Sequence, residues 1–456
     1  MGNKKRLIII ISTSVIVLVC SILLLFHFLG KGNIDTKRYN LFVDGKIIVE
    51  KDGKYGYLNR KGKVEIDFLY DYAEPFYKGV AVVCNNDKYF LIDEDGRPIN
   101  NNNYDYLDID HNSDKIIFKR NDKFGIMTLK SKIIVDAIYD YISYYSEGLA
   151  SVINDNKYGY VNEKGKMVIE CKYDRAGRFS EDYAVVKIDD KYGYINKKGE
   201  LVISNLYDAA HDFYNGYAIV EVETSSGNNY KVIDKKGKTI YTDYDYISRT
   251  KNCFVVEKDD SFSIINKKGN ITGLSSRFEY AYGWNSEGYF VEYVFAEDDD
   301  NLYVLDEKGI LIFSTEFDKD YWSDIIVDYH VAEFLYAKQT NSKLIIISSN
   351  GKTLEYAYTE EDPKVYVENN KIIINKNEKF GVIDFKGNTL VDFNYDSISI
   401  SNDDYVVVEV DGKYGVIDLK GNIIIPIQYD DIPVSYFYYY YLWLKNIYSN
   451  KFKFNT

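Results

Sequence analysis

The sequence KYGYINKKGELVISNLYD, residues 191–208, contains the pattern that decides the fold. Its first part alternates along the chain so that the two tyrosines point to one face of a strand, with Gly193 and Ile195 on the other. The NKKG segment places Asn196 first and Gly199 last, which is typical of a type I turn followed by a positive-φ residue in a β-hairpin. The stretch therefore predicts two paired antiparallel strands. A glycine inside a strand, here Gly193, also predicts close approach of another backbone or ring.

This hairpin recurs along the chain. KYGY starts at 54, 157 and 191, and its variants KFGI, KFGV and KYGV start at 123, 379 and 413. Degenerate copies start at 88, 229, 261, 301 and 343, so eleven starts follow one another at intervals of 32 to 42 residues, most of them near 34. One such unit is too small to bury both of its faces, and neighbouring units must stack to build a core.

The remainder of each unit is also regular. A Tyr-Asp pair follows the hairpin, as in Tyr70-Asp71 and Tyr207-Asp208. A longer connection then ends in an aromatic residue and a glycine, and a run such as VAVV or YAIV comes next, which predicts a third strand. Each unit is therefore expected to hold three strands, or four if the Tyr-Asp segment is extended.

The combination of an aromatic-Gly dipeptide, a D-x-x-G-like turn, a Tyr-Asp pair and an F-x-x-G-x-A-x-V strand resembles the WG-repeat family of bacterial proteins. The resemblance covers residues 41 to about 440 and is strongest in repeats one to five, ten and eleven. This chain carries Tyr or Phe where the family usually has Trp. The resemblance implies a β-rich repeat fold, generally of unknown molecular function, and it supplies no catalytic residues. The hairpin is also locally similar to the shorter aromatic hairpins of choline-binding cell-wall repeats.

The expected fold class is all-β tandem repeats, about eleven units of ~34 residues, arranged either as a propeller-like ring or as an open β-solenoid. Hydrophobic residues make up 46% of the chain, enough to build a core. Eleven units exceed the usual four to eight blades of a propeller. By analogy alone, we favour the propeller-like arrangement.

The amino terminus predicts a membrane anchor. Residues 7–29 are predominantly apolar and long enough to span a hydrocarbon core of roughly 30 Å. The stretch lacks the short apolar region and small-residue cleavage site of a signal peptide. Because Lys4, Lys5 and Arg6 precede it, we expect a cytoplasmic amino terminus and extracytoplasmic repeats in a single-pass protein of the cell membrane.

The predicted organisation follows from these features. It comprises a cytoplasmic tail at 1–6, a transmembrane helix at 7–29, a linker at 30–40 and a repeat domain at 41–456. Within that domain, repeats are regular over 41–222, degenerate over 223–365 and regular again over 366–440, with a partial terminal unit at 441–456. A specialised site is expected in the degenerate repeats six to nine, with neutral drift as the competing explanation.

Charge and motif content narrow the functional classes. The net charge of −14 disfavours a grip on nucleic acid, which relies on clustered Lys and Arg. The histidines, His27, His111, His211 and His330, are isolated, and the cysteines lack metal-ligand spacing. The acidic run 297–300 lacks the calcium-loop pattern. We therefore expect no catalytic, metal or cofactor-binding residues, and no cofactor.

Two recurring residue types remain as candidates. The aspartates of the Tyr-Asp pairs could converge as catalytic acids or metal ligands, but aspartate at the start of a connection more commonly caps the backbone amides of that same connection. The aromatic residues of the KYGY position could stack a sugar or hold a cation, although the most regular position of a repeat is normally a packing position. These candidate ligand-stacking residues, more often core, are Tyr55, Phe124, Tyr158, Tyr192, Phe380 and Tyr414.

The function expected from the sequence is a non-enzymatic module that binds or scaffolds protein or cell-wall glycan at the outer face of the membrane. Two alternatives remain open. One is a glycan-acting enzyme with acidic residues at the repeat axis. The other is an accessory sensor ectodomain, which would need a membrane partner because the inner tail has only six residues.

Overall fold

The computed structural model describes residues 40–225, 227–249, 253–259, 261–266, 371–401 and 403–433, together with the strands between 280 and 368. The predicted tail at 1–6, membrane helix at 7–29 and partial unit at 441–456 lie outside these residues. Within the described part, the fold is all-β, and no helix there is long and apolar enough to cross a membrane. The chain forms two compact units, one containing residues 109–317 and the other residues 34–108 with 318–456.

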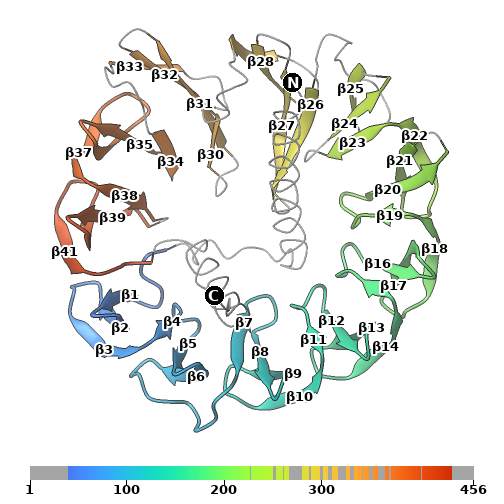
Figure 1. Ribbon diagram of the computed structural model, residues 1–456, viewed down its shortest axis with the longest axis horizontal. Coiled ribbons are helices and arrows are strands. Elements are labelled where there is room, and N and C mark those ends of the chain that lie inside the picture. Colours follow the sequence, from blue (N-terminus) through green and yellow to red (C-terminus); the bar gives the residue numbers. More distant parts are fainter. Residues whose placement is uncertain are drawn as a thin grey trace, which may run out of the picture. The chain divides into compact units, whose positions relative to one another are not determined.

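The described strands form eleven small antiparallel sheets of three or four strands, not a closed barrel. In the first unit the sheets are β10-β9-β8-β7, β11 to β14, β15 to β18, β19 to β22, β23 to β25 and β26 to β29 (Figure 1). Their bounds are β7 Tyr106–Asp110, β8 Lys115–Arg120, β9 Lys123–Thr128, β10 Ile133–Tyr139, β11 Tyr141–Ile142, β12 Leu149–Asn154, β13 Lys157–Asn162, β14 Met167–Tyr173, β15 Arg175–Ala176, β16 Tyr183–Ile188, β17 Lys191–Asn196, β18 Leu201–Tyr207, β19 Ala209–Ala210, β20 Tyr217–Thr224, β21 Gly227–Asp234, β22 Thr239–Tyr244, β23 Tyr246–Arg249, β24 Cys253–Lys258, β25 Ser261–Asn266, β26 Tyr280–Ser286, β27 Tyr289–Glu297, β28 Asn301–Asp306 and β29 Leu311–Glu316.

The second unit holds the sheets β1 to β3, β4 to β6, β30 to β33, β34 to β37 and β38 to β41. Their bounds are β1 Lys46–Lys51, β2 Lys54–Asn59, β3 Val64–Tyr70, β4 Tyr72–Ala73, β5 Val80–Asn85, β6 Lys88–Asp93, β30 Ile325–Asp328, β31 Glu333–Thr340, β32 Lys343–Ser348, β33 Thr353–Ala357, β34 Val365–Glu368, β35 Lys371–Lys376, β36 Lys379–Ile383, β37 Thr389–Tyr395, β38 Ser397–Ile400, β39 Tyr405–Val410, β40 Lys413–Asp418 and β41 Ile423–Tyr429.

The hairpin turns have the predicted geometry. Between β17 and β18, the Asn196 Oδ1 accepts hydrogen bonds from the amides of Lys198 and Glu200, and Gly199 has a φ of +79°. The same positive φ recurs at the corresponding turn glycines of the other regular repeats. In the third repeat Ser131 takes this position with a φ of +60°, a conformation that glycine adopts without strain.

The glycine inside the strand also has the predicted role. Tyr192 pairs with Tyr207 while Tyr194 pairs with Ile203, so β18 fits two more residues than β17 between these pairs, beside Gly193. A Cβ added at Gly193 would lie 2.6 Å from the Ile203 carbonyl oxygen. The irregular outer strand therefore approaches the glycine too closely for any side chain, and this contact explains the aromatic-Gly dipeptide.

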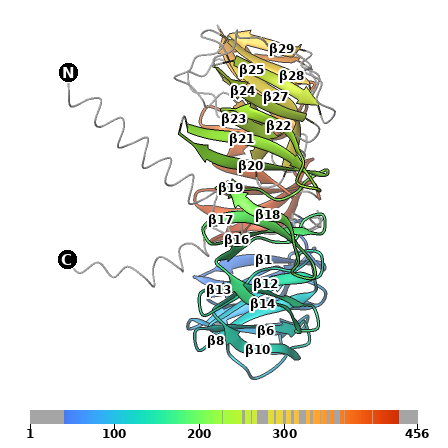
Figure 2. The ribbon, with the colours of Figure 1, turned by 90° about the vertical axis from the view of Figure 1, so that its right-hand side faces the viewer.

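The cores lie between consecutive sheets, which are stacked face to face (Figure 2). Tyr194 packs in the core between the β15 to β18 sheet and the β19 to β22 sheet, whereas its neighbour Ile195 packs in the preceding core. This placement confirms that the two residue types of KYGYIN face opposite sides of the strand. The β15 to β18 sheet is thus buried on both faces by its neighbours, as stacking of small units requires.

A sheet is offset from the sequence repeat. The KYGY strand and the outer strand, which ends at the tyrosine of the Tyr-Asp pair, close one sheet. The short strand after the aspartate and the following β-branched strand open the next. In the first unit, for example, β17 and β18 complete one sheet and β19 and β20 begin the next. A fourth strand does form, but it begins after the Tyr-Asp pair and is only two residues long in β11, β15 and β19.

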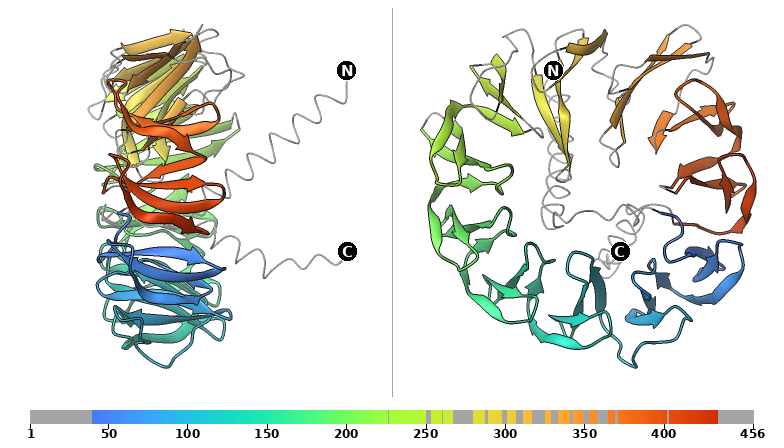
Figure 3. Two further views of the ribbon diagram at one scale, coloured as in Figure 1. Left: turned by 90° about the vertical axis from the view of Figure 1, so that its left-hand side faces the viewer. Right: turned by 180° about the vertical axis from the view of Figure 1, so that it is seen from behind.

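The first and last described repeats lie side by side within the second unit (Figure 3). The amide of Asp430, after β41, donates to the Glu50 carbonyl of β1, and Glu50 forms a β-bridge with Asp431. A shared core joins Ile47 and Val49 of β1 to Val416 and Ile425 of the last sheet. These contacts repeat those between consecutive sheets elsewhere.

Candidate functional site

The six aromatic residues singled out in the sequence all lie against the cores between sheets. Each one pairs across the hairpin with the tyrosine of the Tyr-Asp pair, as Tyr158 does with Tyr173. Tyr55 is 6% exposed and belongs to a core, while Phe124, Tyr158, Tyr192, Phe380 and Tyr414 are half-buried and pack against the cores. Because five of the six side chains are only half-buried, ligand stacking stays a prediction.

The second tyrosine of the KYGY motif is the more deeply buried one. The hydroxyl groups of Tyr57, Tyr160 and Tyr194 donate to backbone carbonyls in the next sheet, those of Glu74, Gly177 and His211. Their rings contact a phenylalanine of that sheet edge to face, with 4.9 Å between the ring centroids of Tyr160 and Phe179. Burial raises the pKa of Tyr160 and Tyr194 well above the ordinary value, so these hydroxyls stay protonated. They hold consecutive sheets together.

The aspartates of the Tyr-Asp pairs also join consecutive sheets. Asp174 follows β14, and its Oδ1 accepts from the Lys157 Nζ of β13 at 2.6 Å. Its backbone amide donates to the Lys187 carbonyl of the next sheet. The second carboxylate oxygen binds the next sheet as well. In the preceding repeat, for example, the Asp140 Oδ2 accepts from the amide of Asp155, in the hairpin turn of the next sheet. We call this set of contacts, from lysine to aspartate to the next hairpin, the aspartate link.

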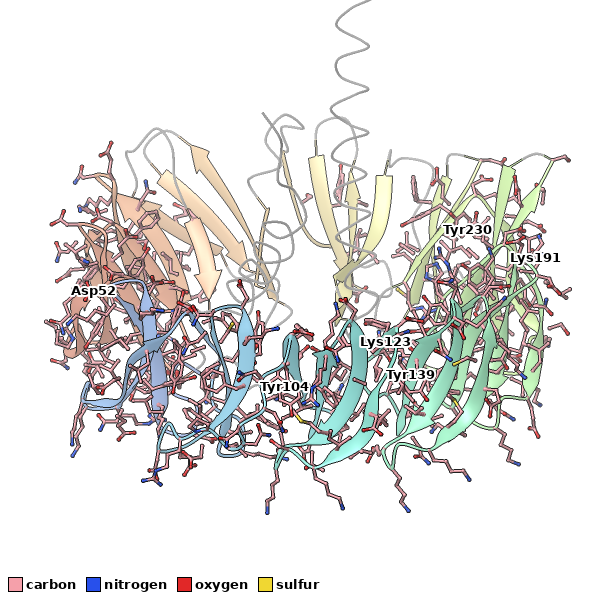
Figure 4. All side chains as sticks on the ribbon, turned by 60° about the horizontal axis from the view of Figure 1, so that its bottom comes forward. Asp52, Tyr104, Lys123, Tyr139, Lys191 and Tyr230 are labelled. Atoms are coloured by element: carbon pink, nitrogen blue, oxygen red, sulfur yellow. The ribbon has the colours of Figure 1, made fainter. Side chains whose placement is uncertain are left out.

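The aspartate link recurs through both units with constant spacing. Each lysine precedes its aspartate by 17 residues. The pairs are Lys54–Asp71, Lys88–Asp105, Lys123–Asp140, Lys157–Asp174, Lys191–Asp208, Lys379–Asp396 and Lys413–Asp430. Figure 4 labels Lys123 and Lys191, which come from equivalent positions of β9 and β17. The structural reading of these aspartates is confirmed, but the expected partner was wrong: the carboxylate caps the next hairpin, not its own connection.

The aspartate link also joins the last repeat to the first. The Asp430 Oδ2 accepts from the amide of Asp52 at 2.6 Å, in the hairpin turn between β1 and β2. Arg60, in the next turn of that sheet, lies over the ring of Tyr405 at 6.0 Å. The corresponding contact between consecutive sheets is that of Lys235 over Tyr183, at 5.6 Å.

The electrostatics of the linked aspartates do not suit a proton donor. Hydrogen bonds from the paired lysines lower the pKa of Asp71, Asp140, Asp174, Asp208, Asp396 and Asp430 below the ordinary value. A general acid near neutral pH needs the opposite shift. These carboxylates are therefore ionised and occupied by structural partners.

A charged column interrupts the regular pattern in the first unit. Arg178, Asp212 and Arg249 occupy equivalent positions in three successive connections. The Arg178 Nε donates to the Asp212 Oδ2 at 3.3 Å, and both side chains are largely buried. Burial lowers the pKa of Arg249 to about 10, and its guanidinium lies over the ring of Phe254 at 5.7 Å. The sequence reasoning did not identify this column, because its members are 34 and 37 residues apart in otherwise variable positions.

The exposed turns after the KYGY strands are rich in lysine in the first unit. The turns at 129–132, 163–166, 197–200 and 235–238 together carry nine lysines and two glutamates. Lys197 forms ion pairs with Glu147 and Asp182, and Lys235 forms one with Glu181. The other seven lysines are exposed and form no ion pair with any described residue. We call these four turns the lysine edge.

The remaining candidate chemistry is sparse in the part of the chain that the structure covers. No group of three His, Cys, Asp or Glu side chains is placed there to hold a metal ion. Cys84 and Cys253 are buried, and burial raises the pKa of the Cys84 thiol to about 11. Of the acidic run, 298–300 lies outside the described residues.

Comparison with known proteins places the repeats in a family. The family model described as "WG containing repeat" matches residues 55–89, 124–158, 158–192, 192–223, 380–414 and 414–439. Each match from 55 to 414 begins at the aromatic residue of the KYGY position. No curated protein matches the sequence.

Several solved structures show partial likeness at low identity. One titled as a eukaryotic initiation factor is 8% identical, with 86% of this chain and all of that chain covered and a TM-score of 0.40. Kluyveromyces lactis Hsv2 is 8% identical over 52% of this chain and 89% of that chain, with a TM-score of 0.22. PorZ of Porphyromonas gingivalis is 6% identical over 75% of this chain and 57% of that chain, with a TM-score of 0.24. These likenesses carry no argument about function.

Proposed function

Since this chain is a WG-repeat protein, we propose that it is a non-catalytic binding or scaffold module held at the cell membrane. Residues 7–29 are the anchor, the amino terminus is cytoplasmic, and the repeats lie outside the cytoplasm. The partner is protein or cell-wall glycan. One observation carries the proposal: the recurring residues join one repeat to the next, as Lys157 and Asp174 do, and leave side chains of the hairpin turns exposed, as at Lys164 and Lys166. Stacked repeats of this kind present a continuous surface, which is the arrangement that repeat proteins use for binding.

We further propose a propeller-like order of repeats, in which the last repeat neighbours the first. The contacts of Asp430 with Asp52 and Glu50 support this order, because an open solenoid would leave these repeats at opposite ends. Small-angle scattering tests it. A maximum dimension as long as an extended stack of all the repeats would contradict the closed order.

The two alternative functions receive less support. Enzymatic action through the recurring aspartates would need a carboxylic acid that is protonated near neutral pH, and the lysine partners lower the pKa of Asp174 and its equivalents. No described contact favours the sensor alternative, which needs a second membrane protein.

Two experiments test the proposed function. The full chain, purified in a neutral detergent, is incubated with isolated cell envelope and with candidate envelope proteins, and we expect retention on at least one of them. Absence of retention on both would refute the binding role. Separately, external protease should degrade the repeats in intact cells, and protection of the repeats until the membrane is broken would refute the extracytoplasmic location.

A further inference from the structure

In four sheets of the first unit, the hairpin turns at the two ends of the strands differ in charge. In an antiparallel meander, consecutive hairpin turns fall at opposite ends of the strands. The turns that precede the KYGY strands carry acids, such as Asp122, Asp155 and Asp189. The turns that follow them form the lysine edge, with nine lysines against two glutamates. The connections at the same end carry acids, and three of them, Glu147, Glu181 and Asp182, pair with Lys197 and Lys235. The other seven lysines of the lysine edge leave their charge exposed.

Seven of the nine lysines of the lysine edge are available, because the turns are held through backbone amides and not through the lysine side chains. In the turn after β13, the amides of Lys164 and Lys166 donate to the Asn162 Oδ1, and their side chains are exposed. By contrast, the lysines at the acidic end are used within the fold, since Lys157 and Lys191 bind the aspartates of the aspartate links. The two ends therefore differ in free positive charge as well as in composition.

We propose that the lysine edge binds an anionic polymer that carries phosphate groups along its length, which names the glycan class of the proposed function and rests on it. Lysine binds phosphate as a compact point charge, without needing a fixed geometry. The four turns come from successive repeats, so a polymer with regularly spaced phosphates can reach several of them at once. Simultaneous contacts raise the overall affinity well above that of a single exposed lysine.

The surroundings favour a polymer over a lipid surface. A membrane-binding surface would concentrate exposed apolar side chains beside its basic residues. In this unit they are instead spread along the outer strands. Leu206 and Ile138, 66% and 56% exposed, lie at the ends of β18 and β10 away from the lysines, whereas Ile133 next to Lys132 is only 40% exposed. The four turns also lack aromatic residues, which would stack the bases of a nucleic acid.

The second unit supplies a matched control. Its corresponding turns contain Lys61, Lys63, Lys386 and Lys420, all exposed and at the same turn positions as Lys164, Lys166, Lys198 and Lys236 of the lysine edge. Replacing either set with glutamine removes four charges from equivalent places. The two variants therefore have the same net charge and differ only in which unit has lost it.

The test uses the full chain in nanodiscs of phosphatidylcholine and measures binding to fluorescent long-chain polyphosphate. We expect the wild type and the second-unit variant to bind, and the lysine-edge variant to lose at least about tenfold in affinity. Binding should weaken as salt is raised, since exposed charge contacts are screened. A variant with arginine at Lys164, Lys166, Lys198 and Lys236 should retain binding, and unchanged thermal unfolding would show that all variants are folded.

Several outcomes would overturn the proposal. They are absence of polyphosphate binding, equal losses in the two glutamine variants, and stronger binding to phosphatidylglycerol vesicles than to polyphosphate, which would identify a lipid surface. Retention on isolated envelope separates this proposal from the proposed function. If the lysine-edge variant is retained as well as the wild type, the polymer assignment fails while the binding role stands.

Discussion

The glycine of the KYGY motif offers a sharp test of the repeat architecture. In Gly193→Ala, the new Cβ would lie 2.6 Å from the Ile203 carbonyl oxygen and 2.8 Å from the Asn205 nitrogen, where ordinary contacts begin at 3.4 Å. The outer strand β18 must therefore move by close to an ångström. Because Ile203 packs in a shared core, this movement disturbs the contact with the next sheet. Overpacking of this kind costs about 1–3 kcal/mol.

The expected result is a thermal midpoint lowered by roughly 2–12 °C, since 1 kcal/mol corresponds to about 2–4 °C for a unit of this size. Circular dichroism on the full chain in neutral detergent measures it. Gly177→Ala is the matched control, because its Cβ would meet nothing closer than 3.5 Å and its φ is not positive. That change should be neutral or stabilising by up to about 1 kcal/mol. Equal effects of the two substitutions would refute the close-approach explanation.

Three further predictions concern the contacts between repeats. Tyr160→Phe leaves the partly buried Gly177 carbonyl without its donor and should cost about 1–3 kcal/mol by urea unfolding. Tyr158→Phe, at the half-buried position, should have a smaller effect, and the reverse order would contradict the assignment. Asp430→Ala should lower the thermal midpoint about as much as Asp174→Ala, because both aspartates form aspartate links; no effect at Asp430 would argue against the junction of the first and last repeats. The lowered pKa of the linked aspartates means that the unfolded chain binds more protons in acid, so their stabilisation is present above pH 3.8 and is lost as pH falls through the folded pKa. The urea concentration at the unfolding midpoint, measured from pH 6 downward, should therefore decrease once the pH is below about 4. Asp174→Asn should make this decrease smaller.

Local features of the repeat were predictable from the sequence. The positive φ of Gly199 and the close backbone approach at Gly193 follow from turn and strand chemistry that depends on neighbouring residues only. Burial of Ile195 and Tyr194 on opposite faces follows from strand alternation.

Contacts between repeats were harder to predict. Asp208 binds Lys191 at a spacing of 17 residues that recurs in seven repeats, and this regular spacing was a signal available in the sequence. The hydrogen bond from Asp52 to Asp430 spans 378 residues, and nothing in a local pattern states which repeat neighbours the first. The column of Arg178 and Asp212 depends on how successive connections superimpose, which only the three-dimensional structure supplies.

The aspartate link bears on how such a chain can lengthen. Each 34-residue copy contains a lysine and the aspartate that binds it, together with a hairpin turn that receives the aspartate of the copy before. A duplicated copy therefore arrives with both halves of the joint, one for each neighbour. Tandem duplication of a single unit needs no compensating substitution to be accommodated, so the number of repeats can change in one genetic event while the turn residues diversify afterwards.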